Sequence, residues 1–114
     1  MVMIPQNERG VRILNTYRGR RLNNGIAIIE VEDNDTGHVT YRSSRDESYP
    51  EFNWGYNGTG PWYVAEFLLK NVTGDFDVVK KFSEAFSAEF SNRWGDGWVI
   101  TSNEILQWLS NHRP

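Results

Sequence analysis

The segment from Phe52 to Pro61 has the sequence FNWGYNGTGP. Its residue types and their spacing make it the segment of the chain best suited to bind a ligand. Gly58 and Gly60 flank Thr59 and allow a ligand to approach the backbone closely, and Pro61 suits the first turn of a helix. Backbone N–H groups at a helix start bind anions such as phosphate. One interpretation of this segment is therefore a phosphate-binding loop.

The same segment has a structural interpretation, which we favour because glycine-rich turns before helices are commonest as plain connectors. Phe52, Trp54 and Tyr56 alternate as in a strand, which would place their side chains on one face. Gly55 leaves the opposite face bare, so the aromatic face is expected to be core. This interpretation predicts that Trp54 is buried against the helix beginning at Pro61, with its indole N–H paired.

Three arginines near the N-terminus form a second group of residues that could bind a ligand. Arg18, Arg20 and Arg21 follow Tyr17 and could together hold a phosphate, because guanidinium groups bind phosphate through two parallel hydrogen bonds. A run of charge is more often a solvated strand edge that opposes aggregation, and we favour that interpretation.

The sequence gives little support for a catalytic site or a metal site. Asp46, Glu47 and Glu51 flank the aromatic segment and could act as general acid and base beside Tyr56, but their spacing is equally typical of a solvated loop. The two histidines lack a second ligand at metal-binding spacing, and the chain has no cysteine. We expect no catalytic residue, metal or cofactor, and a small carboxylate-dependent hydrolase is the weakest hypothesis.

Length and charge narrow the class of protein. The 114 residues predict a single domain over residues 1–114, with residues 1–10 as a loosely ordered N-terminal segment. A net charge of −3 disfavours binding of duplex nucleic acid. Residues 1–45 hold seven arginines against five acids, whereas residues 46–114 hold five basic against ten acidic residues.

Neither a signal peptide nor a membrane-spanning run is evident, so we expect a cytoplasmic protein without a membrane partner.

The first half of the chain has the pattern of strands. Residues 11–17, 26–31 and 38–42 are rich in β-forming residues, and turn sequences separate them at residues 23–25 and 33–37. Residues 98–100 are either a brief fourth strand or a buried connector.

The second half has the pattern of helices. An apolar helix follows Pro61, Gly74 ends it, and Asp75 is placed to cap the next helix. Thr101 and Glu104 have the spacing of a capping box for a last helix. The second helix carries a periodic apolar stripe formed by Phe76, Val79, Phe82, Phe86 and Phe90, and the first four of these residues are expected to face the sheet. The whole pattern predicts an α+β fold, in which about three helices pack on one face of a small antiparallel sheet of about three or four strands.

Residues 52–61 resemble the F-x-W-G-Y-x-G-[ST]-G-P signature of an uncharacterised domain family of phages, plasmids and bacterial chromosomal islands. Weaker patches at residues 17–19 and 98–108 extend the likeness over residues 12–110. The family supplies no established activity, so the resemblance implies a mobile genetic element as the context. Trp62 and Tyr63 depart from the family pattern, which has smaller or polar residues there, and they would enlarge an aromatic surface.

Together these observations predict a non-enzymatic binding protein, encoded by a phage or another mobile element, that binds a host protein such as a component of antiviral defence and inhibits it. Tyr, Trp and Arg dominate protein interfaces, which makes the following residues candidate contacts: Arg18, Arg20, Arg21, Trp54, Tyr56, Trp62 and Tyr63. The alternative is a small-molecule or nucleotide binder, in effect a sponge for a phosphorylated ligand. It would use Gly58, Thr59 and Gly60 at the helix start together with the same arginines.

Overall fold

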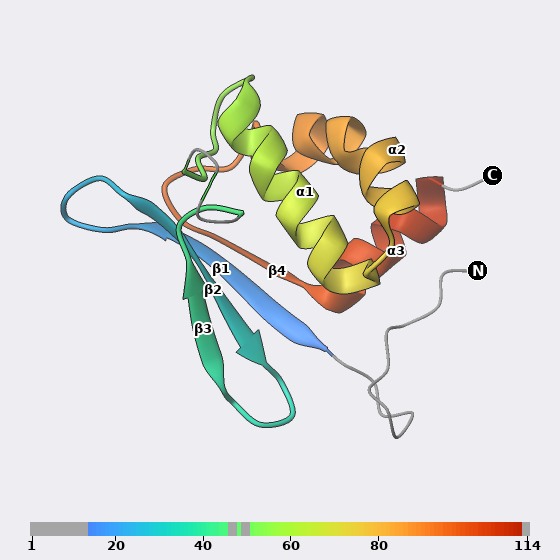
Figure 1. The fold of residues 1–114 in the computed structure, drawn as a ribbon, viewed down its shortest axis with the longest axis horizontal. Coiled ribbons are helices and arrows are strands. Elements are labelled where there is room, and N and C mark those ends of the chain that lie inside the picture. Colours follow the sequence, from blue (N-terminus) through green and yellow to red (C-terminus); the bar gives the residue numbers. More distant parts are fainter. Residues whose placement is uncertain (1–13, 46–47, 49–50, 113–114) are drawn as a thin grey trace.

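The computed structural model describes residues 14–45, 48 and 51–112, and it is an α+β fold, as the sequence predicts (Figure 1). Four antiparallel strands form one sheet in the order β3–β2–β1–β4. The strands are β1 (Asn15–Arg21), β2 (Ala27–Asp33), β3 (Val39–Arg42) and β4 (Trp98–Thr101). The helices α1 (Thr59–Thr73), α2 (Phe76–Phe86) and α3 (Ser102–His112) all lie on one side of the sheet. A π-helical turn, η1 (Ser87–Ser91), continues α2.

Two short turns connect the first three strands, at the positions predicted from the sequence. Gly25 adopts a φ of 87° between β1 and β2, and Gly37 adopts a φ of 74° between β2 and β3, which are values that favour glycine. The carboxylate of Asp33 accepts hydrogen bonds from the backbone N–H groups of Asp35 and Thr36 in the second turn. Residues 98–100, left open between strand and connector, belong to β4. Residues 11–13 and the N-terminal segment 1–10 lie outside the described residues.

Alternation along β1 sends its side chains to two different environments. Tyr17 and Gly19 face the helices and are buried, whereas Arg18 and Arg20 lie on the opposite face of the sheet. Gly19 faces Trp98 of β4, and a Cβ at position 19 would lie 2.0 Å from Cε2 of that indole. Trp98 can therefore pack in the core only because residue 19 is a glycine.

The helix ends follow the signals in the sequence. α1 ends at Gly74, which adopts a left-handed φ of 62° and donates its N–H to the carbonyl oxygen of Lys70. The carboxylate of Asp75 caps α2 by accepting from the N–H groups of Asp77 and Val78. Thr101 and Glu104 form the predicted capping box, with both reciprocal hydrogen bonds at 3.2 Å.

Val79, Phe82 and Phe86 of the aromatic stripe are buried, but the stripe does not pack against the sheet as predicted. The rings of Phe82 and Phe86 stand edge-on to Trp108 of α3, with centroids 6.1 Å and 5.2 Å away. α2 packs mainly against α1, whereas α3 contacts β1 and β4. Phe76 was assigned to this stripe wrongly: it is 73% exposed, because it opens the first turn of α2 and contacts Lys70 at the surface instead.

Candidate functional site

Residues 51–56 form an extended segment that bends at Gly55. Phe52 donates its N–H to the carbonyl oxygen of Ser43, and both Phe52 and Trp54 are 1% exposed, so the predicted burial of Trp54 is confirmed. The predicted strand with three aromatic residues on one face is wrong. Gly55 has a φ of 87° and turns the chain, which leaves Tyr56 45% exposed.

Trp54 is held by aromatic and cationic neighbours. Its ring meets that of Trp98 in a T-shaped contact, with centroids 5.4 Å apart, and the guanidinium of Arg21 lies 4.8 Å above it. The indole N–H has no acceptor among the described residues, so the predicted hydrogen bond is absent there. Its neighbours explain this, because a guanidinium offers only donors and an indole ring has no conventional acceptor.

Tyr56 explains the spacing of the two glycines that follow it. A Cβ at Gly58 would lie 2.8 Å from Cε2 of Tyr56. A Cβ at Gly60 would lie 2.5 Å from the Tyr56 hydroxyl oxygen and 2.8 Å from Cβ of Asn53. The glycines therefore make room for the phenol ring against the start of α1. This packing accounts for the G-x-G pattern without a bound phosphate.

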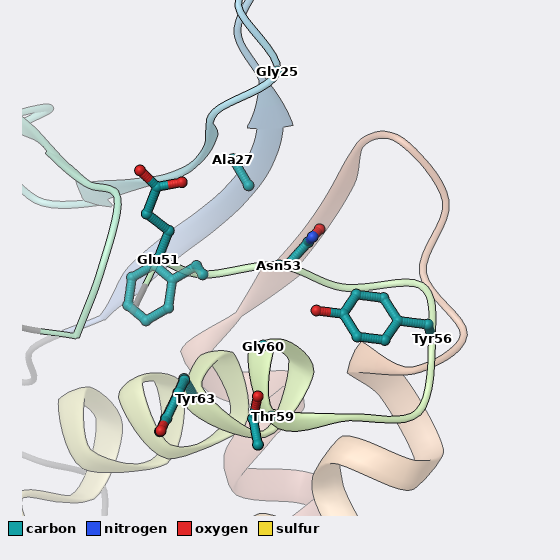
Figure 2. Close-up of a pocket in the computed structure, with 9 residues that line it drawn as sticks. Gly25, Ala27, Glu51, Asn53, Tyr56, Thr59, Gly60 and Tyr63 are labelled. Carbon is teal, nitrogen blue, oxygen red and sulfur yellow. The ribbon is translucent and has the colours of Figure 1, made fainter. Parts of the chain in front are cut away.

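A pocket of about 190 Å³ opens beside this ring, between the β1–β2 hairpin and the start of α1 (Figure 2). The Tyr56 hydroxyl is directed toward Asn53 and Gly60, while the Glu51 side chain extends toward the hairpin. The carboxylate of Glu51 has no ion-pair partner among the described residues. The lining comprises Gly25, Ala27, Glu51, Phe52, Asn53, Tyr56, Thr59, Gly60 and Tyr63.

Four of the predicted binding residues therefore share one pocket, namely Tyr56, Thr59, Gly60 and Tyr63. Gly58 supports the Tyr56 ring from outside the lining, and Trp62 is half-buried beside Tyr63 in a T-shaped ring contact at 5.7 Å. Sequence reasoning missed Asn53 and the hairpin residues Gly25 and Ala27. No local signal joins the hairpin to a segment about 30 residues away, because only the folded sheet brings them together.

The three arginines do not converge on the helix start. Arg18 pairs with Glu32 at 2.8 Å and Arg20 with Glu30 at 2.7 Å, both on the sheet face away from the helices. Arg21 alone reaches the aromatic segment, where it donates to Oδ1 of Asn53 at 2.8 Å and to the carbonyl oxygen of Trp54 at 3.1 Å. It also pairs with Asp96 at 3.2 Å. The donors of Arg21 thus hold the segment in place.

Glu51 is the one member of the carboxylate trio that can be located, because Asp46 and Glu47 lie outside the described residues. It shares the pocket with Tyr56, as the acid–base hypothesis requires of the pair. Within the described residues, no group of three His, Asp or Glu side chains is placed to hold a metal ion. None of the helices in that part of the chain has the length and apolar character needed to cross a membrane.

Comparison with known proteins identifies a family. No curated protein and no solved structure matches the chain. A family model matches residues 17–111, a range that includes most of β1 and α3, all of the other strands and helices, and the whole pocket. The chain therefore belongs to DUF6166, a family of unknown function.

Proposed function

We propose that the protein is a non-enzymatic protein-binding domain, and that its pocket receives a basic side chain from the partner. The observation that carries this proposal is the carboxylate of Glu51, which has no ion-pair partner in the described part of the chain and lines a pocket that also exposes the ring of Tyr56. A pocket lined by a carboxylate and an aromatic ring suits lysine or arginine, whose cation can form an ion pair with the first and a cation–π contact with the second.

The two tyrosines of the pocket have different parts in this proposal. Arg45 already lies over the ring of Tyr63, with its Cζ 4.9 Å from the centroid, and pairs with Glu66. Tyr56 packs one side of its ring on Gly58 and leaves nearly half of its surface exposed. A partner's cation would therefore bind against Tyr56, while Tyr63 and Trp62 supply aromatic surface around it.

Charge complementarity supports a basic partner. Residues 46–114, which include α1 and most of the pocket, hold ten acidic against five basic residues. An acidic surface steers the approach of a basic protein and repels acidic ones. The pocket volume of about 190 Å³ suits one side chain, which would serve as the anchor within a larger interface.

The biological setting is also part of the proposal. The likeness of residues 52–61 to the mobile-element signature supports a phage or plasmid gene whose product acts in the host cytoplasm. The partner would then be a host protein, such as a component of antiviral defence, which the small domain inhibits by occupying its surface.

Reversing the charge of Glu51 tests the pocket directly. In capture from a bacterial lysate, we expect the parent protein to retain a partner with a basic surface and Glu51→Lys to retain at least about tenfold less of it. A like charge in place of the ion pair costs several kcal/mol, and 1.4 kcal/mol corresponds to a factor of ten. Quantitative mass spectrometry of the retained proteins measures the ratio.

Glu84→Lys is the matched control, because Glu84 is exposed on α2 and outside the pocket. It makes the same change in net charge and should retain the partner as the parent does. The proposal fails if Glu84→Lys loses as much partner as Glu51→Lys. It fails equally if the lysate yields no retained protein and leaves the melting temperature unchanged.

A further inference from the structure

We propose that a groove between β3 and α1 is a second binding site, and that it takes a phosphate monoester with a flat or apolar substituent. The groove has a volume of about 350 Å³ and is separate from the pocket beside Tyr56. Its lining consists of Arg42, Arg45, Phe67, Lys70 and Asn71. This inference does not depend on the proposed protein partner.

The fold gathers these residues from two elements. Phe67, Lys70 and Asn71 stand three and four residues apart on α1, so they share one side of the helix. Arg42 is the last residue of β3 and pairs with Ile29, whose side chain is fully buried on the helix-covered face of the sheet. Arg42 therefore projects toward α1, and its guanidinium lies 5.7 Å from the ring centroid of Phe67.

Within the described ranges, two positive charges in the groove have no carboxylate partner. Arg45 pairs with Glu66, but neither Arg42 nor Lys70 forms an ion pair with a carboxylate among the described residues. The chain has 15 acidic against 12 basic residues, so this local excess of positive charge runs against its overall composition. Two cations that no described carboxylate neutralises match the charge of a phosphate monoester, which carries nearly two negative charges at neutral pH.

Each of the two cations already has a contact within the protein. Nη2 of Arg42 donates to the carbonyl oxygen of Arg45 at 2.6 Å, and the guanidinium retains other N–H donors. The ammonium group of Lys70 lies 5.2 Å from the ring centroid of Phe76. Groups that are already positioned lose less conformational entropy when a ligand binds.

Asn71 adds a neutral donor whose orientation is fixed from the core side. Its Oδ1 accepts from the hydroxyl of Tyr17 at 2.6 Å and from Nδ2 of Asn15 at 3.1 Å. Burial raises the pKa of Tyr17, so the phenol remains protonated and donates at neutral pH. With the oxygen engaged there, the NH₂ group of Asn71 remains as the donor that the groove can use.

Phe67 favours an ester over free phosphate. Its ring is partly buried against the core and lines the groove, which provides an apolar wall next to the two cations. A substituent on the phosphate would cover this wall and gain the free energy of apolar burial, whereas inorganic phosphate would not. Phenyl phosphate combines both features and is the probe of choice.

Titration by calorimetry and by amide chemical shifts tests this site, with phenyl phosphate, inorganic phosphate and benzoate as ligands. We expect phenyl phosphate to bind most tightly and to shift the amide signals of residues 67–71. Arg42→Gln and Lys70→Gln should each weaken its binding at least about tenfold, because each removes a charge-assisted hydrogen bond to the phosphate. A phosphotyrosine tripeptide distinguishes the source of the ester: tighter binding than phenyl phosphate indicates a protein side chain, and equal or weaker binding indicates a small molecule.

Lys80→Gln is the control, because Lys80 is exposed on α2 and outside the groove. It removes one positive charge and should leave the affinity for phenyl phosphate unchanged. Lys70 is exposed on the surface of α1, so its variant is expected to fold even if loss of the Arg42 hydrogen bond destabilises the other. The proposal is overturned if no probe binds, if benzoate binds as tightly as phenyl phosphate, or if Lys70→Gln and Lys80→Gln weaken binding equally.

Discussion

Trp54→Ala is expected to lower the free energy of unfolding by about 3–5 kcal/mol, as large-to-small changes of buried aromatic residues do. Trp54 is 1% exposed, and its indole contacts the Trp98 ring and the Arg21 guanidinium. The substitution removes both contacts. Urea denaturation followed by far-ultraviolet circular dichroism measures the change.

Trp54→Phe is the companion variant, because it keeps an aromatic ring and removes an indole N–H that has no acceptor among the described residues. An unpaired buried donor carries a cost of about 1–3 kcal/mol, so its removal offsets part of the lost contact area. Trp54→Phe should therefore lose clearly less stability than Trp54→Ala and should still retain the partner. A Trp54→Ala protein with unchanged stability and abolished binding would show instead that Trp54 is a recognition residue.

Phe82→Ala is expected to destabilise the protein to a similar extent, by about 3–5 kcal/mol. Phe82 is 7% exposed and packs edge-on against Trp108, which joins α2 to α3. The indole N–H of Trp108 in turn donates to Glu89 of η1, which continues α2. Loss of the Phe82 ring is therefore expected to weaken the packing at the end of α2 as well. Denaturant unfolding again provides the measurement.

Phe76→Ala is the control from the same helix, since Phe76 is 73% exposed and contacts Lys70 across the surface. An exposed cation–π contact contributes about 0.5–1 kcal/mol, so this variant should lose no more than that. Equal losses for Phe76→Ala and Phe82→Ala would contradict the placement of α2.

The fold class, the turns and the helix caps could be predicted from the sequence because local chemistry determines them. Gly25 and Gly37 stand where a positive φ is needed, and Asp75 and Thr101 stand where N–H groups need an acceptor. The packing of α2 could not be predicted in this way. An apolar stripe shows that a helix face is buried, but it does not show whether a sheet or another helix covers that face.

The candidate site was only partly predictable for a related reason. The motif drew attention to Tyr56, Thr59 and Gly60, yet the alternation of aromatic residues suggested one continuous strand. The turn at Gly55 ends that alternation, and a glycine in a strand pattern does not reveal its φ in advance. The arginines of β1 looked like one group in the sequence, but a period of two divides them between the faces of the sheet.

Site-specific photo-crosslinking at position 56 tests the proposed protein-binding pocket most directly. With p-benzoylphenylalanine in place of Tyr56, irradiation in host cells is predicted to link the domain covalently to one protein, at a peptide that contains lysine or arginine. The same photoreactive residue in place of Gln107, which is exposed on α3, should give no such product. A product of equal yield from both positions, or none from position 56 in a correctly folded protein, would contradict the assignment of this pocket to a protein partner.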